Sequence, residues 1–481
     1  MILSEKQLLY IFINVGIIAI GFGLTFLSLY FLKIKDKHMR LMFILYVIYW
    51  VAPLIAREYT GLIQEHMDVG TTWLIGTPGI WVVVPLIVYG VISTIWRPLN
   101  DIFAYKLKSR RIVLWIALAI QLVTYLPMVI YPSFATNIVQ TVGCGVGASC
   151  IGLFNLAFDE HQGKEKVFTT VSIVAIPPIL AQFIASGFES LLTSFTPDVY
   201  VHADYVNLMR YLWLISIVFI IVAAILTIFV KENRNTLYKI HKPKEAIENK
   251  YDQIMLTLLC LVGLCLSFEK WATSGPTASI QVAYISSQTG VDTRAYEGYS
   301  GLIYSVGQLI STIIVGFVLR PEHKHKHRAW LLVTSGVMFF IYLGLSSSIV
   351  NIPMFMGSQI INGFAYGLIY PVILGIILNK VFIKRNVITP IGIYNTFMGM
   401  GVCLGTFVNS YWKSDIFDQI HGFSTFSFRD FKLANWFVNL ICIGIIGVAV
   451  IFYLGNFFIH KKHEPRQVKL KRTTISMDAE I

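Results

Sequence analysis

Apolar segments of about twenty residues recur along almost the whole chain, and short polar segments separate them. A helix of this length crosses the hydrocarbon core of a bilayer, which is about 30 Å thick. Windows of this kind lie at residues 8–32, 41–62, 75–97, 112–132, 135–157, 168–193, 209–230, 252–275, 295–319, 328–349, 352–379, 386–411 and 432–459. The pattern predicts an all-α, polytopic membrane protein with about thirteen transmembrane helices.

Basic residues are concentrated in alternate polar segments, and few lie in the segments between them. The segments that we expect on one side of the membrane are residues 33–40, 106–111, 164–166, 231–251, 320–328, 380–385 and 461–472, all of which carry Lys or Arg. The segments between them carry mainly acids: Glu65, Asp68, Asp198, Asp204, Asp292 and Glu297. Short basic loops stay in the cytoplasm. We therefore expect a protein of the cell membrane with its N-terminus outside and its C-terminus in the cytoplasm.

The composition supports a membrane protein and excludes several other classes. The chain has 481 residues, of which 56% are hydrophobic and 13% charged, against about 25% charged in soluble domains. The net charge is +12, but the Lys and Arg residues lie in short loops between helices and in the C-terminal tail. Membrane orientation explains this distribution, so the charge does not indicate nucleic-acid binding. The six cysteines lie in apolar segments without metal-ligand spacing, and no nucleotide-binding signature is present. We expect no cofactor.

Without its first helix, the chain divides into two sets of six helices. The expected division is an extra N-terminal helix with a basic loop (1–40), a six-helix bundle (41–230), a cytoplasmic linker (231–251), a second six-helix bundle (252–460) and a cytoplasmic tail (461–481). The two sets echo one another weakly, since Gln140 and Gly143 in the fourth core helix match Gln359 and Gly363 in the tenth. A parallel repeat of this kind, related by a pseudo-two-fold axis, is typical of transporters whose site lies between the halves. In the fifth core helix, Pro177-Pro178 predicts a break.

The segment after the second core helix resembles the signature loop of the major facilitator superfamily, G-x-L-x-D followed by a basic turn. Leu99 and Asp101 match that pattern, whereas Arg97 replaces its glycine and the basic residues come late. The glycine-rich fourth core helix, which ends in Asp159-Glu160, is similar too. The resemblance implies twelve core helices, alternating access, and a cytoplasmic gate to which Asp101, Arg110 and Arg111 would contribute. The extra leading helix departs from the family's count.

Charged pairs within the membrane are the main candidates for a binding site, because burying an ion there costs about 2.5–3.5 kcal/mol. Arg57-Glu58 lies in the first core helix, and Glu269-Lys270 lies at a similar depth in the seventh, its counterpart in the second half. Cations at matching depth would converge on a central cavity and bind an anion, as in the organophosphate antiporter branch of the superfamily. The alternatives are snorkelling to the outer surface or structural ion pairs.

Uncharged polar residues on the expected cavity helices add to this site. The candidates for substrate binding are Arg57, Glu269, Lys270, Asn155, Gln359, Asn362, Tyr366 and Asn395. The amide and phenol groups would orient a polar solute or else join helices by hydrogen bonds. Glu58 and Glu269 are also candidates for proton coupling, since a carboxyl group surrounded by a low-dielectric medium binds a proton more readily than in water.

These observations favour a monomeric secondary transporter that moves a small polar solute, anionic or zwitterionic. The sequence leaves open whether H+ or Na+ is coupled to this movement or whether the protein is a passive uniporter. Three alternatives stay open. The first is a proton-coupled exporter or drug or metabolite efflux pump on the same fold. The second is a membrane-embedded enzyme, for which only Asp159–His161 offers a catalytic cluster. The third is a scaffold whose leading helix docks a partner.

Overall fold

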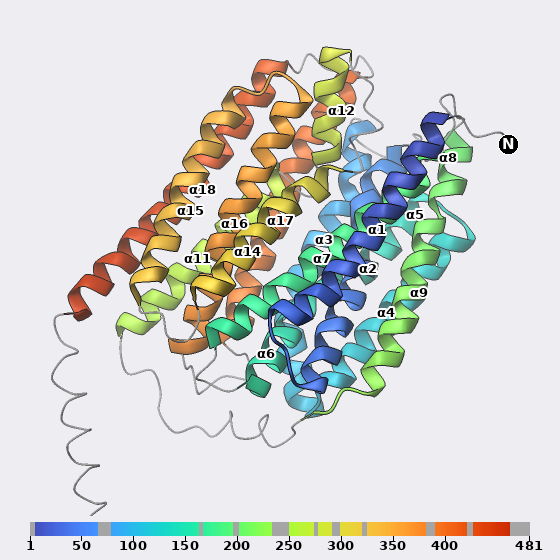
Figure 1. Cartoon of the computed structure of the whole chain (residues 1–481). Coiled ribbons are helices and arrows are strands. Elements are labelled where there is room, and N and C mark those ends of the chain that lie inside the picture. Colours follow the sequence, from blue (N-terminus) through green and yellow to red (C-terminus); the bar gives the residue numbers. More distant parts are fainter. Residues whose placement is uncertain are drawn as a thin grey trace, which may run out of the picture.

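The computed structural model describes residues 5–65, 78–162, 167–195, 202–232, 250–273, 278–290, 299–319, 325–380, 390–420 and 427–461. Within these ranges every regular element is an α-helix (Figure 1). In chain order they are α1 (Glu5–Phe31), α2 (Lys37–Glu65), α3 (Pro78–Leu107), α4 (Arg110–Ile130), α5 (Phe134–Ser149), α6 (Ile151–Gln162), α7 (Val167–Thr193), α8 (His202–Met209), α9 (Tyr211–Ile228), α11 (Lys250–Thr273), α12 (Ala278–Thr289), α14 (Ser300–Val318), α15 (His325–Ser347), α16 (Ile352–Lys380), α17 (Pro390–Ile420) and α18 (Phe428–Lys461).

Twelve candidate membrane spans lie among the described residues. The helix α3 is of similar length, but its described part carries Arg97, Asn100 and Asp101, and it falls outside that count. With α3 included, the structure confirms the predicted all-α, polytopic fold, and α1 supplies the additional N-terminal helix.

The basic loop that we predicted after the second core helix is mostly helical. The helix α3 continues through Arg97 to Leu107, and the turn before α4 is short. Lys108 adopts a left-handed backbone conformation (φ 55°), and Ser109 Oγ accepts a 3.1 Å hydrogen bond from the backbone N of Ile112, which caps α4. The hydropathy window ended the span at Arg97 because charged residues lower its average, although apolar residues continue at helical spacing.

The break that we predicted at Pro177-Pro178 is absent, because α7 runs without interruption through both prolines. Most of α7 is buried within the bundle. Neighbouring helices can hold a membrane helix together where proline removes a backbone hydrogen bond, so the prediction was wrong at this position. The fourth core helix is interrupted instead: α5 ends and α6 begins on either side of Cys150, whose backbone N donates to Gly147 O at 3.2 Å.

We name α2–α9 the first half and α11–α18 the second half. The helix α3 packs along α17, and α7 packs against α14, so the halves meet along two pairs of helices. The apolar cluster of each half also takes in residues of the other. Trp271 and Val402 join the first cluster, and Leu156 and Ala175 join the second. The expected linker lies mostly outside the described residues, as does the tail after Lys461.

The leading helix α1 lies against α7 (Figure 1). Two glycines allow this close approach. A Cβ atom on Gly21 would lie 2.7 Å from Cγ1 of Ile184, and one on Gly187 would lie 2.6 Å from Cγ1 of Ile18. Small residues permit this kind of contact between membrane helices. The helix α1 therefore packs as an integral member of the first half.

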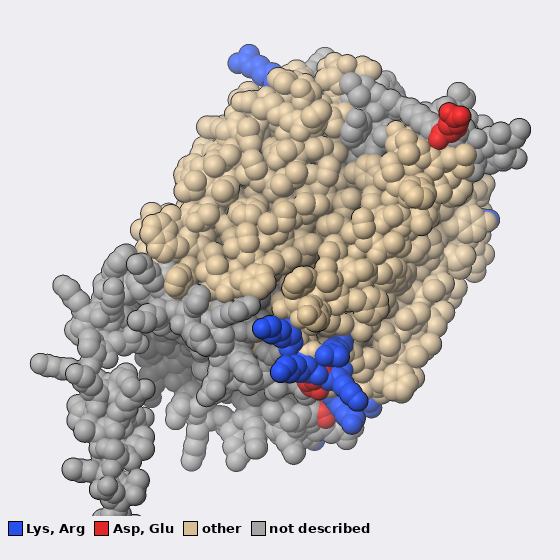
Figure 2. Space-filling view, in the orientation of Figure 1, with Lys and Arg blue, Asp and Glu red and all other residues tan. Residues whose placement is uncertain are grey.

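One end of the bundle is strongly basic. The cations between α1 and α2 and at the end of α3 are exposed: Lys33, Lys35, Lys37, Arg40 and Lys106. Figure 2 shows basic side chains gathered at this end of the molecule. We call it the basic end and the other the opposite end. The helices α2 and α11 begin at the basic end, and α3 finishes there (Figure 1).

Candidate functional site

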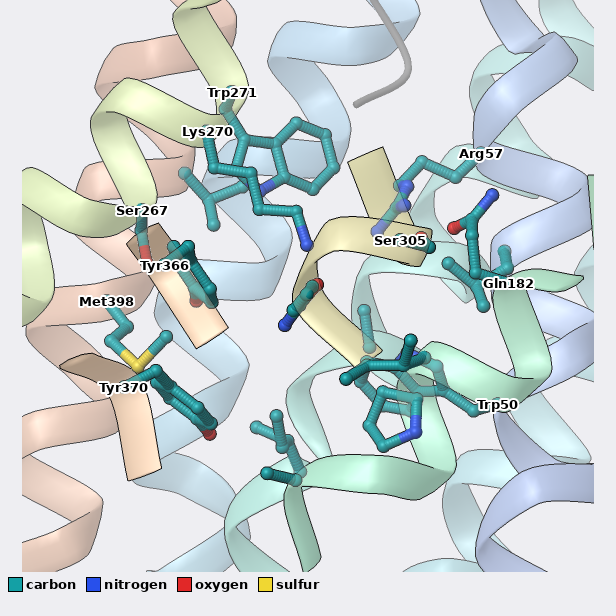
Figure 3. A pocket seen from close by; sticks show the side chains of 18 of the residues that line it. Trp50, Arg57, Gln182, Ser267, Lys270, Trp271, Ser305, Tyr366, Tyr370 and Met398 are labelled. Atoms are coloured by element: carbon teal, nitrogen blue, oxygen red, sulfur yellow. The ribbon is translucent and has the colours of Figure 1, made fainter. Parts of the chain in front are cut away.

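A cavity of about 100 Å³ lies between the two halves. The first half contributes residues of α2, α3, α5, α6 and α7, and the second half contributes residues of α11, α14, α16 and α17 (Figure 3). Arg57 and Lys270 approach the same space from different sides in this view. A shared cavity at the contact of two bundles is the arrangement that the internal echo predicts for a transport site.

Three cations line this cavity: Arg57 on α2, Arg97 on α3 and Lys270 on α11. None of its described lining residues is Asp or Glu. Helical side chains tilt toward the N-terminus of their helix. Arg57 and Lys270 therefore reach toward the basic end, and Arg97 reaches toward the opposite end, so that all three are directed into the cavity.

Aromatic rings hold the cations at the opposite end of the cavity. The guanidinium carbon of Arg57 lies 4.6 Å from the centroid of the Trp271 ring, and this ring stacks on Tyr89 at 5.1 Å. Lys270 Nζ lies 5.0 Å from the ring of Tyr304 and 5.3 Å from that of Tyr366. A cation over an aromatic face gains about 0.5–2 kcal/mol without losing its charge. Aromatic faces thus hold both cations in the cavity wall.

Arg97 was not among our candidates for substrate binding, yet the structure places it in the cavity wall. Its exposed fraction is 8%. Nη1 donates a 2.8 Å hydrogen bond to the backbone oxygen of Asn395 on α17, across the contact of the halves. Its Nε has no hydrogen-bond partner among the described residues. The apolar residues that continue at helical spacing after Arg97 were the signal that could have placed it inside the helix.

Glu269 belongs to a second buried cluster, apart from the residues that line the cavity. Its side chain is fully buried, and Oε1 accepts hydrogen bonds from Asn362 Nδ2 at 2.6 Å and Thr273 Oγ1 at 2.9 Å. Gln359 Nε2 donates to Thr273 O at 3.3 Å. Glu269 Oε2 has no partner among the described residues. Successive helical residues project about 100° apart, which explains why Lys270 faces the cavity and Glu269 does not.

The remaining polar candidates also lie at different places. Tyr366 lines the cavity and stacks on Tyr370 at 5.6 Å. Asn155 and Asn395 are buried behind the cavity wall, and their side-chain oxygen and nitrogen atoms lack partners among the described residues. The side chain of Glu58 lies outside the described residues. The structure therefore brings Arg57, Lys270 and Tyr366 together and separates the others from them.

The three gate candidates lie at the basic end. Asp101 and Arg110 are buried. The backbone N of Arg111 donates to Glu232 Oε1 at 2.5 Å, and Ser109 Oγ donates to Glu232 Oε2 at 2.6 Å. These two contacts join α4 to the segment after α9, within the first half. Nearer the cavity, the hydrogen bond from Arg97 Nη1 to Asn395 O crosses to the second half.

The helical bundle, with a polar cavity between its halves, is the architecture of a solute transporter. A family model described as the Major Facilitator Superfamily matches residues 41–406, and the chain belongs to this family. The family and the fold are those of transporters rather than enzymes. A comparison with curated proteins finds no match.

Solved structures share the fold at low sequence identity. The human organic anion transporter MFSD10 is 10% identical, with a TM-score of 0.61 over 86% of this chain and 100% of the other. The proton:xylose symporter XylE is 12% identical, with a TM-score of 0.59 over 87% and 96%. A bacterial homologue of the iron transporter ferroportin is 12% identical, with a TM-score of 0.58 over 87% and 100%. These likenesses describe the fold alone.

Proposed function

We propose that this protein is a secondary transporter that carries a small anionic solute across the cell membrane by alternating access. One observation carries the proposal: three cations from both halves line one cavity, and no described lining residue is acidic. Proteins that share this fold include an organic anion transporter, a proton:xylose symporter and a bacterial homologue of an iron transporter. The fold therefore does not identify the substrate, and the proposal rests on the residues that line the cavity.

Electrostatics favour an anion over the other solutes. Three cations with no acid among the described lining residues favour a negatively charged solute, because like charges repel a cation and a neutral sugar gains little from them. A zwitterion would fit with its carboxylate near Arg57 and Lys270, but its ammonium group would find no acidic partner among the described lining residues. Neutral hydrogen-bonding groups such as Gln182 and Ser305 line the same space (Figure 3) and would orient the solute.

The same cations provide a link between solute binding and movement of the halves. Arg57 belongs to the first half and Lys270 to the second, so an anion held by both joins the two bundles. Binding energy of this kind lowers the free energy of the closed state relative to the open ones. We expect the halves to rock about the bound anion, with the basic end in the cytoplasm.

Glu269 is the proposed coupling group. It is fully buried and hydrogen-bonded to Asn362 and Thr273, and it is adjacent in sequence to Lys270. A proton on Glu269 would remove a negative charge from the neighbourhood of the cavity. The carboxyl group would then influence the affinity for the anion without touching it.

The test is uptake into proteoliposomes that contain the full-length protein, with a panel of labelled small carboxylates and phosphates against sugars and amines. We expect uptake of one or more anions only. Arg57→Gln and Lys270→Gln should each lower it about tenfold or more, because each removes a charge-assisted hydrogen bond. Lys432→Gln is the matched control, since Lys432 lies over the ring of Phe428 at the start of α18 and not in the cavity. Uptake of no anion, or of neutral solutes in preference, would overturn the proposal.

A further inference from the structure

We infer that the solute is a short dianion with acidic groups at its two ends, and that Arg97 binds the second of them. This inference rests on the proposed function, since it names the substrate class of the same cavity. It starts from Arg97, the cation that neither the sequence pattern nor the family resemblance assigns to the solute. Three points carry it: the position of Arg97, its free donors and the size of the cavity.

The first point is that the backbone of Arg97 lies at a different level of the cavity wall from that of the ring contacts around Arg57. Tyr89 and Arg97 are both on α3 and line the cavity. Eight residues separate them, which is about 12 Å along a helix. Tyr89 stacks on Trp271, whose ring also packs against Arg57. Arg57 thus lies at the level of Tyr89, whereas the backbone of Arg97 lies nearer the basic end and its side chain tilts toward the opposite end. Arg97 therefore enters the cavity from a different direction than Arg57.

The second point is the donor set of Arg97. A guanidinium group has five N–H donors in a planar fork that matches a carboxylate or phosphate. Among the described residues, Arg97 Nη1 donates a hydrogen bond to Asn395 O. Nε is buried without a partner among the described residues. A buried donor without a partner costs about 1–3 kcal/mol, and an acidic group in the cavity would remove this cost. The bond to Asn395 meanwhile holds the fork in place.

The third point is size. The cavity volume of about 100 Å³ is well below the roughly 300–1,000 Å³ of pockets for drug-sized ligands. This favours a chain of only a few carbon atoms between the two acidic groups. One acidic group would lie between Arg57 and Lys270 and the other against Arg97. The net charge of the solute would then offset two of the three cations.

The experiment compares dicarboxylates with their monoamides, which have nearly the same shape and one charge less. The probes are malonate, succinate and glutarate, each paired with malonamate, succinamate and glutaramate. Calorimetry on the purified full-length protein gives the Kd of each. We expect at least one dicarboxylate to bind about tenfold or more tightly than its monoamide. In Arg97→Gln this difference should disappear, while the Kd of the monoamide changes less than about twofold. Arg97→Lys should keep part of the difference.

Each other outcome is decisive. A dicarboxylate that binds no better than its monoamide to the unaltered protein overturns the inference. So does Arg97→Gln if it weakens both probes of a pair equally, because Arg97 would then only join α3 to α17. If a monoamide binds through Arg57 and Lys270 and the dicarboxylate binds no more tightly, the inference is overturned. The proposed function still stands in that case. Binding of no probe at all overturns the inference and leaves the proposed function to the uptake panel of carboxylates and phosphates. Thermal unfolding of Arg97→Gln and Arg97→Lys shows whether either variant is folded.

Discussion

Asn14, in the leading helix, accepts a 2.8 Å hydrogen bond from the hydroxyl group of Tyr299, which directly precedes α14 in the second half. Its Nδ2 donates to Ser194 Oγ at 2.9 Å, directly after α7 in the first half. Asn14 has an exposed fraction of 1%. One side chain of α1 therefore joins both halves, in addition to the apolar packing of α1 on α7.

Removing this side chain should destabilise the protein measurably. We expect Asn14→Leu to lower the free energy of unfolding by about 0.6–2 kcal/mol, the range for polar contacts between membrane helices. The measurement is thermal or denaturant unfolding of the purified protein. A double-mutant cycle with Tyr299→Phe should show coupling between the two residues. The control is Thr25→Val, because Thr25 Oγ1 donates only to Gly21 O within α1. Additive effects of Asn14→Leu and Tyr299→Phe would argue against the link.

The contact between α14 and α16 depends on two glycines. A Cβ atom on Gly363 would lie 2.0 Å from the backbone oxygen of Tyr304, and one on Gly307 would lie 2.0 Å from that of Ile360. Backbone atoms cannot move aside cheaply, so Gly363→Ala should cost about 1–3 kcal/mol or more and lower Tm. Gly336→Ala on α15 is the matched control. It has nothing within 4 Å, and alanine is the better helix former there. A Tm unchanged by Gly363→Ala would contradict the packing.

Trp271 should influence anion binding through Arg57, whose guanidinium group it holds at 4.6 Å. Trp271→Leu removes the cation–π contact and the stacking on Tyr89, so we expect the Kd of the transported anion to rise about threefold to thirtyfold. Trp271→Phe should have a smaller effect, since a ring remains. The control is Trp330→Leu, because Trp330 on α15 is 61% exposed. Equal affinity in Trp271→Leu and the unaltered protein would rule out this role.

Glu269→Gln tests the proposed coupling group. Glutamine resembles a protonated carboxyl group and can still accept hydrogen bonds from Asn362 and Thr273. We therefore expect the variant to fold and to exchange solute across proteoliposome membranes, but to lose accumulation driven by a pH gradient. Glu232→Gln is the control, because Glu232 lies at the basic end and contacts Ser109 and Arg111 instead. Gradient-driven accumulation that survives in Glu269→Gln would exclude Glu269 from coupling.

Much of the fold could be predicted because hydropathy and helix length depend on local sequence. The bilayer requires about twenty apolar residues for each span, and the chain shows this repeatedly. The end of α3 and the continuity of α7 could not be predicted this way. Arg97 lowers the local average although the buried helix continues beyond it. Pro177 and Pro178 break isolated helices, but neighbouring helices compensate for them here.

The positions of the candidate residues could be predicted only in part, and their roles stay predictions. Arg57 and Lys270 were expected to converge because intramembrane charges are costly, and the structure places both on one cavity. Arg97 was interpreted as part of a loop, since the signature pattern has glycine there. Glu269 and Lys270 were treated as one unit, although helical geometry directs neighbouring side chains about 100° apart. The surroundings of each side chain depend on the neighbouring helix, which the local sequence does not reveal. Glu269 faces α16, where Asn362 Nδ2 donates a hydrogen bond to its carboxyl group.

The leading helix α1 also determines on which side of the bundle the first described helix begins. The helix α1 starts at the opposite end of the bundle from the one where α18 finishes (Figure 1). A reporter fused ahead of Glu5 and one fused after Lys461 would therefore sample different compartments in an intact cell. An impermeant thiol reagent or antibody could then label one and leave the other untouched, so each molecule would carry its own internal reference for membrane integrity and topology.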